Sequence, residues 1–378
     1  MMRLIRIKSI AIINAHLNDY PTPIVGYLSS FGSLSGVSLV LQIITGILLA
    51  SHYNANISLA FLSLEHIIRD VNDGWLFRYM HSNGASIFFF CLYLHIYNNF
   101  YSEAEDLVWL SGVALYLLAI VTAFVGYTLP WGQISYWGAT VITNIFTSIP
   151  VVGQKISLWL WGGFSIANPT LNRFFSLHYC IPFIMVAVII WHLSLLHIDD
   201  STVEDDEYIG FLYYYLIKDL FIFFCFITVY TWLVFFHPNL LSHPDNYLVA
   251  SFSNTPSHLV PEWYFWPFYA VLRSVPNKLG GLIIIIFIFV DIFLIENINA
   301  DDESDLQHDN IFDLTSTLDT NQTIYNVENE EDIGTFIVLF YLGGIDTEEP
   351  YPDLASLLTL FHFFELFDFD LDVDEFVE

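Results

Sequence analysis

Four histidines in two pairs are the residues of this chain best suited to bind a prosthetic group. His81 and His95 are 14 residues apart, and His178 and His192 repeat this spacing. Fourteen residues are just under four helical turns, so the members of each pair lie on one stripe of a helix, about 21 Å apart. Imidazole binds metals and haem iron. Because a histidine inside a membrane helix is costly and usually functional, the pairs predict a bound cofactor.

Haem suits these histidines better than a bare metal ion. Two facing imidazoles would leave a metal ion short of ligands, because no carboxylate lies beside them at helical spacing. Haem needs only two axial ligands and supplies the other four itself. The alternative interpretation is that the four histidines form hydrogen bonds to neighbouring helices. A third pair at the same spacing, His52 and His66, straddles a helix end and a loop and is interpreted as chance.

Long apolar segments must position these side chains. Each is long enough to cross a bilayer as a helix, and six stand out: Phe31–Tyr53, Gly84–Tyr101, Leu107–Trp131, Phe174–Ile198, Leu216–Phe236 and Leu279–Asn297. Two weaker candidates, Ile333–Leu342 and Leu354–Phe369, bring the expected number to about eight. The helices that carry the histidines are separated by one crossing and run parallel. His81 can therefore face His178 at one depth, and His95 can face His192 at another.

Glycines on the first and third segments repeat the histidine spacing. Gly32 and Gly46 are 14 residues apart, and so are Gly112 and Gly126. Glycine removes the side chain where another group must approach the backbone closely. The shared period is the strongest sequence evidence for a cofactor between these helices.

The composition, the apolar segments and the histidine pairs together predict an all-α integral membrane protein, a bundle of about eight transmembrane helices with a four-helix dihaem core. Hydrophobic residues make up 55% of the 378 residues, charged residues only 13%, and the mean hydropathy is +0.57. Soluble domains are about a quarter charged. We expect a dihaem bundle in residues 1–210, and further helices with a long loop and an acidic tail in residues 211–378. The acid behind the formal net charge of −30 must lie outside the hydrocarbon, and it gathers in Asp199–Glu207, Asp301–Asp332 and Asp346–Glu378.

Two connections are too long to be simple turns. Gly132–Arg173 and His237–Lys278 each span about 40 residues and are rich in Trp, Pro, Gly and Tyr. Ordered loops of this length are usually functional. Counting the crossings places both on the same side of the membrane, so together they could build one site.

Four stretches of this chain resemble cytochrome b of the mitochondrial respiratory chain, the haem subunit of complex III. They are FGSLSGVSLVLQIITGILLASHY from Phe31, RYMHSNGAS from Arg78, GYTLPWGQISYWGATVITN from Gly126 and PEWYFWPFYAVLRSVPNKLGG from Pro261. The resemblance covers roughly residues 25–299. It implies that His81 and His178 ligate the iron of a low-potential haem b, and that His95 and His192 ligate that of a high-potential one.

Further positions match the family near the haems. Arg78 is similar to an arginine that pairs with a haem propionate, a role that suits a charged fork near the membrane interface; the alternative is an arginine that only reaches the interface. Asn98 stands where the family commonly has a second arginine, which puts that contact in doubt. The chloroplast-type relatives have a wider second histidine pair and typically an Asp at the position of Glu262, so the resemblance is to the respiratory type.

The resemblance implies a quinol-oxidising pocket between the two long loops. Glu262 in Pro-Glu-Trp-Tyr is similar to a proton-accepting carboxylate, and Tyr264 is the other ionisable group of that tetrapeptide. A carboxyl group at an apolar rim suits proton uptake and release. Tyr127, Gly138 and Tyr269 match other pocket positions, although such aromatic residues also serve as interfacial packing.

A quinone-reducing site is implied on the opposite face. His197 ends the fourth long segment, and Lys218 and Asp219 open the fifth. A histidine and an aspartate beside a quinone headgroup can bond its two carbonyls and deliver protons. The alternative is a surface ion pair between Lys218 and Asp219.

The resemblance thus implies a catalytic subunit of ubiquinol–cytochrome c oxidoreductase. Such a subunit oxidises ubiquinol at one face and passes electrons through two b haems to reduce ubiquinone at the other, with proton translocation. The implied partners are the Rieske iron–sulfur protein, cytochrome c1, other complex III subunits and the lipid bilayer, in a homodimeric complex without nucleic acid. The implied location is the mitochondrial inner membrane, or a bacterial plasma membrane. The competing functions are a membrane dihaem reductase without quinone chemistry, and a transporter, which would need a polar midplane path.

Overall fold

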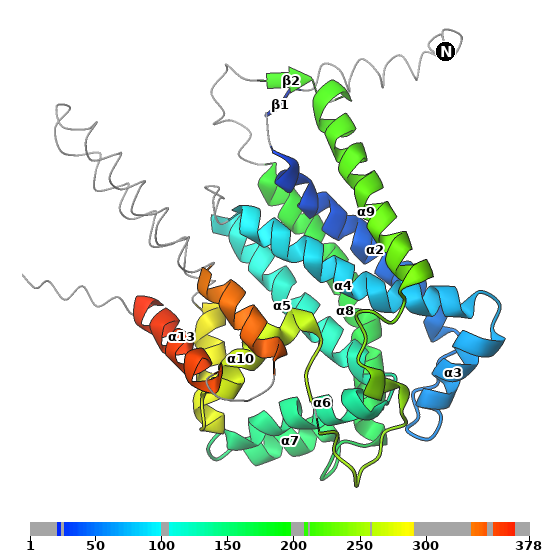
Figure 1. Ribbon diagram of the computed structural model, residues 1–378, viewed down its shortest axis with the longest axis vertical. Coiled ribbons are helices and arrows are strands. Elements are labelled where there is room, and N and C mark those ends of the chain that lie inside the picture. Colours follow the sequence, from blue (N-terminus) through cyan, green and yellow to red (C-terminus); the bar gives the residue numbers. More distant parts are fainter. Residues whose placement is uncertain are drawn as a thin grey trace, which may run out of the picture. The chain divides into compact units, whose positions relative to one another are not determined.

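Helices dominate the computed structural model, which describes residues 21–23, 26–99, 106–197, 208–210, 212–257, 259–290, 334–345 and 351–366. The labelled helices are α2 (Phe31–Ala50), α3 (Ala60–Asp70), α4 (Gly74–Asn99), α5 (Asp106–Thr128), α6 (Gln133–Asn144), α7 (Gly153–Trp161), α8 (Asn168–Leu196), α9 (Ile217–Phe236), α10 (Trp266–Ser274) and α13 (Tyr351–Leu366) (Figure 1). Two further helices are Lys278–Val290 and Gly334–Gly344. One antiparallel pair of three-residue strands, β1 (Pro21–Pro23) and β2 (Tyr208–Gly210), is also present. The acidic stretches 199–207 and 301–332 lie outside the described residues.

Four of the described helices are long and apolar enough to cross a bilayer. They extend over Tyr27–Ala50, Leu107–Thr128, Asn168–Leu196 and Tyr214–Phe236, which confirms the first, third, fourth and fifth expected segments. An apolar helix of this length can cross a bilayer, because its backbone N–H and C=O groups bond one another and need no water, which the lipid core lacks. The chain is therefore a multi-pass, helical membrane protein.

Helix α4 differs from the expected second segment. It starts at Gly74, ten residues before Gly84, and has 26 residues. Its first half carries Arg78 and His81, so hydropathy alone does not mark where it begins. Backbone bonds from Leu76 N and Phe77 N to Asp73 O start the helix. The other three expected spans match α13 and the two shorter helices only in part, so the total of eight remains a prediction.

The described residues form two compact units, which we treat separately. The first unit consists of Met1–His52, His66–Glu103 and Ile190–Leu240. In it α4 packs against α2 and α9. Asn83 Nδ2 on α4 donates to Pro238 O at 2.9 Å, and Tyr230 OH on α9 donates to Met80 O at 2.8 Å. These bonds fix the depth of α4, which carries two of the histidines, relative to α9.

The second unit consists of Tyr53–Glu65, Ala104–Ile189 and Leu241–Glu378. Its larger core joins the end of α5, α6, the C-terminal end of α7 and the start of α8, and includes Val125, Trp131, Tyr136, Ala139, Trp161, Ile166, Leu171 and Phe174. A smaller core joins α10, α13 and the helix Gly334–Gly344. The units are discontinuous in sequence, and the division at residue 210 stays a prediction about function.

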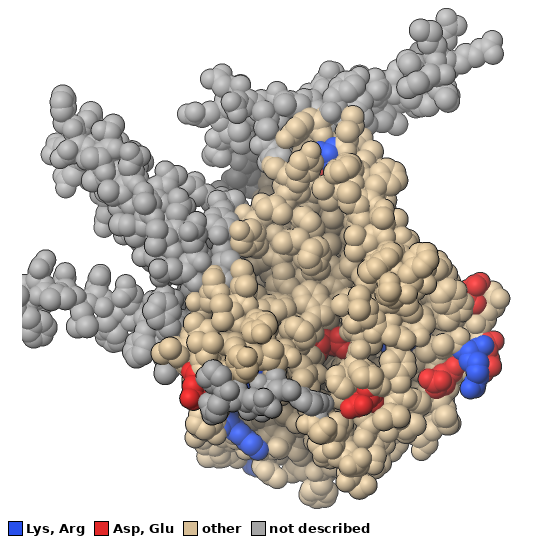
Figure 2. All heavy atoms as spheres, in the orientation of Figure 1, with Lys and Arg blue, Asp and Glu red and all other residues tan. Residues whose placement is uncertain are grey.

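The outer faces of α8 and α9 are apolar. Exposed side chains there include Phe183, Ile190 and Trp191 on α8 and Phe221, Phe224 and Trp232 on α9. In a bilayer, lipid tails or neighbouring apolar helices cover such faces without loss. A group of charged side chains lies on α3, at the right of Figure 2, where Arg69 and His66 bond the Asp70 carboxylate and hold its pKa below the usual range.

Candidate functional site

The two histidine pairs lie on two helices, as the spacing predicts. His81 and His95 are on α4, and His178 and His192 are on α8. All four are partly buried. His95 and His192 belong to the same unit and are close enough for an electrostatic interaction between their rings. His81 and His178 belong to different units, so their pairing remains a prediction.

Three of the four predicted glycines lie directly against histidine rings. A Cβ added to Gly32 would lie 2.9 Å from Cε1 of His95, and one on Gly46 would lie 3.1 Å from Cε1 of His81. A Cβ on Gly126 would lie only 2.6 Å from Nδ1 of His178. Carbon atoms in contact are normally about 3.5–4.0 Å apart. The glycines therefore make room for the imidazoles themselves, and the partner of Gly112 remains a prediction.

Hydrogen bonds at Nδ1 fix the tautomer of two of the histidines. His178 Nδ1 lies 2.9 Å from Thr122 O, and a carbonyl oxygen only accepts, so Nδ1 carries the proton. His81 Nδ1 lies 3.0 Å from Thr45 Oγ1, whose own hydrogen is donated to Leu41 O at 2.7 Å. In this tautomer Nε2 carries no proton, which is the form that binds iron, and such second bonds orient metal-ligating histidines.

These donors and glycines fit an axially ligated haem. The rings of His81, His95 and His178 each lie against a glycine, and the stripe spacing on α4 and α8 suits two groups at two depths. The sequence reasoning missed Thr45 and Thr122. Their only signal is position, since Thr45 precedes Gly46 and Thr122 lies one helical turn before Gly126.

The two long loops meet within the second unit, as is expected of loops that emerge on the same side of the membrane. Gly132 and Val249 form an antiparallel bridge, Gln133 N donates to Leu248 O, and Ala250 N donates to Trp131 O. Side chains add further bonds. Gln133, only 6% exposed, accepts from Ser251 N at 2.7 Å and donates to Asn254 O at 3.1 Å. Asn246 Oδ1 accepts from both N and Oγ of Ser135 at 3.0 Å.

Two aromatic side chains that follow the tetrapeptide Pro261–Tyr264 in the chain hold the backbone around Glu262 by hydrogen bonds. Trp263–Phe265 forms a single 3₁₀ turn, in which Tyr264 is 3% exposed. Trp266 Nε1 donates to Pro261 O at 2.9 Å. Tyr269 OH donates to Leu259 O, also at 2.9 Å. Glu262 is half-buried and lies between these anchored residues.

The other predicted quinol-pocket residues, Tyr127 and Gly138, lie in the same unit as Glu262. Tyr127 is half-buried, and a Cβ on Gly138 would meet nothing within 4 Å. Their distance from Glu262 remains a prediction. Arg78 precedes His81 by just under one turn of α4 and is also half-buried, so its role toward a propionate stays a prediction.

The second predicted site gathers polar groups near the start of α9, in the first unit. Lys218, 7% exposed, donates from Nζ to Gly26 O at 3.1 Å and Ser29 Oγ at 2.9 Å. Asp219 Oδ1 accepts from Ser30 Oγ at 2.6 Å and lies 3.9 Å from Lys218 Nζ. The lysine is therefore buried against the start of α2, not a solvated surface charge. His197, at the end of α8, is exposed; Ser29 and Ser30 were not predicted.

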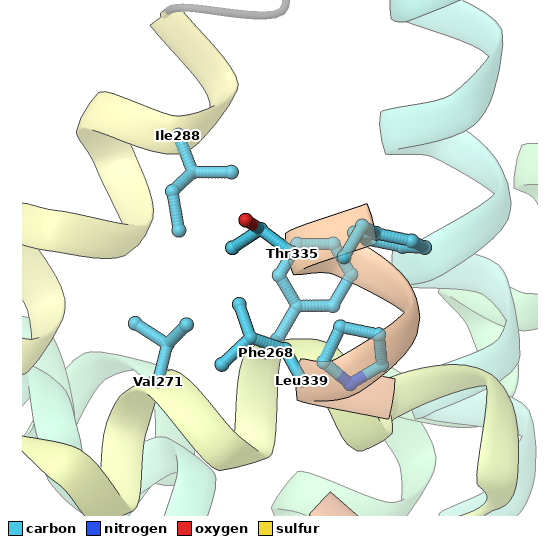
Figure 3. A pocket seen from close by; sticks show the side chains of 7 residues that line it. Phe268, Val271, Ile288, Thr335 and Leu339 are labelled. Carbon is cyan, nitrogen blue, oxygen red and sulfur yellow. The ribbon is translucent and has the colours of Figure 1, made fainter. Parts of the chain in front are cut away.

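One apolar pocket lies beside α10, the helix that follows the Glu262 segment in the chain. In Figure 3 the side chains of Phe268, Val271, Ile288, Thr335 and Leu339 surround its space. Pro267 and Phe336 complete the lining. It contains neither Glu262 nor a charged side chain, so this pocket has no acid–base group of its own.

Comparison with known proteins gives consistent matches. The family model described as cytochrome b/b6/petB matches residues 17–200, and the one described as cytochrome b (C-terminal)/b6/petD matches residues 249–363. Cytochrome b of Chondrus crispus is 44% identical over 375 residues, covering 96% of this chain and 94% of its own. Cytochrome b of Marchantia polymorpha is 53% identical over 297 residues, covering 76% and 74%. A solved chain of a hyperthermophilic respiratory complex III superposes with a TM-score of 0.83 at 27% identity, covering 99% of this chain and 98% of its own.

Proposed function

The chain belongs to the cytochrome b family, and on this premise we propose that it is the dihaem, quinone-binding subunit of a ubiquinol–cytochrome c reductase. The observation that carries the proposal is the set of imidazoles seated against Gly32, Gly46 and Gly126. Residues 1–210 carry the haem ligands, and residues 211–378 carry the quinol-site segment. The family-model boundaries at residues 200 and 249 support this division.

His95 and His192 hold one haem b, and His81 and His178 hold the other. When bound, the two haems supply one-electron transfer in series between the two faces of the membrane. The chain contributes the Nε2 ligands, whose tautomer the Nδ1 bonds to Thr45 and Thr122 fix. Arg78 neutralises a propionate near the interface.

Ubiquinol is oxidised at the paired long loops, and Glu262 accepts one of its protons. The bonds from Tyr269 and Trp266 hold the backbone before Glu262, so the carboxylate is presented in one position. Tyr264 lies beside it, and Tyr127 and Gly138 line the same pocket. A base held in place contributes about 100- to 10,000-fold to such a proton transfer.

Ubiquinone is reduced near the start of α9 and the end of α8. Asp219 and His197 bond the quinone carbonyls and deliver protons taken from the adjacent aqueous phase. Lys218 sets the local charge, and its bonds to Gly26 and Ser29 hold it at the helix end. Uptake of protons at this site and release at the other makes the reaction proton-translocating.

The chain works in a membrane complex with a Rieske iron–sulfur protein, cytochrome c1 and other subunits, as a homodimer. The likeness to a chain of a respiratory complex III supports these partners, and the resemblance of the four quoted stretches to mitochondrial cytochrome b supports the mitochondrial inner membrane.

A potentiometric titration of the reduced-minus-oxidised spectrum tests the proposal. We expect two one-electron steps in the unaltered protein. His81→Ala and His178→Ala should remove the same step, and His95→Ala and His192→Ala the other. A single step, or loss of both steps from every variant, would contradict the assignment. Two steps in a protein that oxidises no ubiquinol would instead favour a dihaem reductase without quinone chemistry.

A further inference from the structure

Arg273 joins two elements at the end of α10. Its Nη1 donates to Ile345 O at 2.8 Å, and its Nη2 donates to Leu342 O. These carbonyls lie at the C-terminal end of the helix Gly334–Gly344, where backbone oxygens lack helical partners. A cationic side chain at that end also interacts favourably with the helix dipole. Arg273 therefore caps this helix from outside it.

The same guanidinium lies over an aromatic ring of the predicted quinol pocket. Its Cζ is 4.8 Å from the ring centroid of Tyr269, one helical turn earlier on α10. This is within the range of a cation–π contact. Arg273 thus restricts the ring from one side, while the Tyr269 hydroxyl is held by Leu259 O on the other.

The end of the helix Gly334–Gly344 also presses on α10 directly. A Cβ on Gly344 would lie 2.7 Å from the Trp266 ring, and one on Gly343 would lie 2.7 Å from Trp266 Cα. Only glycine permits this approach. Trp266 in turn donates to Pro261 O. Trp266 therefore lies directly against this helix end, and Tyr269 is linked to it through Arg273.

We propose that Arg273 is a positioning residue for quinol oxidation, which holds Tyr269, and with it the backbone before Glu262, against the end of the helix Gly334–Gly344. The inference rests on the proposed quinol oxidation at Glu262. A planar guanidinium is required, because it donates to two carbonyls and covers a ring at the same time. A lysine ammonium keeps the charge but offers neither the fork nor the flat face.

Steady-state ubiquinol oxidation by the assembled complex tests this role. Arg273→Lys should raise KM for ubiquinol about 2- to 30-fold, the range of a lost cation–π contact, with a smaller change in kcat and an unchanged haem spectrum. Tyr269→Phe removes the bond to Leu259 O and should also raise KM. Because both residues act through the same series of contacts, the double variant should have a KM no higher than that of the single variant with the higher KM. Multiplying effects, or a wild-type KM for Arg273→Lys, would overturn the proposal.

Arg173 offers a matched control. It likewise lies over a ring, 6.0 Å from that of Trp159, and donates to the carbonyls of Trp159 and Leu160 at the end of α7. Arg173→Lys should leave KM for ubiquinol unchanged. An equal rise in both lysine variants would mean that general loosening, not positioning, is measured, and would overturn the proposal.

A second variant reaches the same contact without touching Arg273. Gly344→Ala pushes the helix end away from Trp266 and should raise KM in the same direction, and a wild-type KM here would contradict the proposal even if Arg273→Lys fails to assemble. The proposed function is tested separately by the unaltered complex. If the unaltered complex oxidises ubiquinol and Arg273→Lys has the wild-type KM, only the positioning role is refuted. If the unaltered complex oxidises no ubiquinol, the proposed function itself is refuted.

Discussion

Gly126 on α5 lies so close to His178 on α8 that no side chain fits between them, because an added Cβ would be 2.6 Å from the ring nitrogen Nδ1. Nδ1 also makes the bond to Thr122 O, one turn earlier on α5. The ring is thus seated by two consecutive turns of one helix. A methyl group at Gly126 would have to displace it from both.

Gly126→Ala should therefore cost one haem. Overpacking of a tight contact destabilises by about 1–3 kcal/mol, and the displaced ring loses the bond that fixes its tautomer. We expect one of two redox steps to disappear or shift in the titrated spectrum. Gly36→Ala on α2 is the matched control, because a Cβ there meets nothing within 4 Å. An intact two-step titration in Gly126→Ala would show that the seat is dispensable.

Glu262→Gln should slow ubiquinol oxidation about 100-fold or more while both haems stay bound. The amide keeps the size and hydrogen-bonding capacity of the carboxylate but takes up no proton, and a positioned base contributes about 100- to 10,000-fold. The measurement is the pH–rate profile, which should change shape. Glu65→Gln on α3 is the control for removing a carboxylate elsewhere. If the Glu262→Gln variant kept the original rate and pH profile, water or a partner subunit would be the acceptor.

Asp219→Asn should slow reduction of ubiquinone while ubiquinol oxidation stays nearly normal. The variant keeps an acceptor for the 2.6 Å bond from Ser30 Oγ but loses the proton it would deliver. Ser30→Ala removes the bond and keeps the carboxylate, so it should have the smaller effect. The two half-reactions are measured separately by inhibiting one site at a time. Equal loss at both sites would assign Asp219 a structural role.

Tyr53→Phe should make stability less sensitive to alkaline pH. Tyr53 OH donates to Leu129 O at 2.6 Å, and burial raises the pKa of this hydroxyl well above its ordinary value. Because the pKa of Tyr53 is raised by folding, the protonated hydroxyl contributes fully to stability below about pH 10. This contribution is lost as the pH rises toward the folded-state pKa. Phe cannot ionise but loses a bond worth about 1 kcal/mol.

The wild-type protein should therefore unfold at a higher temperature than Tyr53→Phe at pH of about 8, and the difference should shrink above about pH 10. Thermal unfolding followed by haem absorbance in detergent measures this. A constant difference over that range would mean that Tyr53 does not titrate as its burial implies.

The sequence predicts the cofactor site best where the information is local. Two residues 14 apart on one helix share a face whatever surrounds them, so His81, His95, Gly32 and Gly46 could be identified from spacing alone. The meeting of the two long loops followed from counting crossings. These arguments need only helix geometry and membrane thickness.

What the sequence did not predict depends on tertiary neighbours. Thr45, Thr122 and Ser30 are hydroxyl residues of a kind found throughout apolar helices, and only the fold brings them to His81, His178 and Asp219. The start of α4 was placed too late because hydropathy falls where Arg78 and His81 enter the helix. The capping of the helix Gly334–Gly344 by Arg273 joins residues 69 and 72 apart in sequence, for which no pattern exists.

The hydrogen bonds between the two long loops also set an order of events during synthesis. Ser135 and Gln133 bond partners 111 to 121 residues further along the chain. Domains emerge N-terminal part first, so α2, α4, α5 and α8 with all four histidines leave the ribosome while the α6 loop still lacks its partners. A truncated or stalled chain that ends before Asn246 would contain all four histidines. The buried amide of Gln133 would, however, lack the backbone groups of Ser251 and Asn254 to which it bonds. If the proposed function holds, loading of haem and completion of the quinol pocket are separable steps in making this protein, and the second must wait for its C-terminal half.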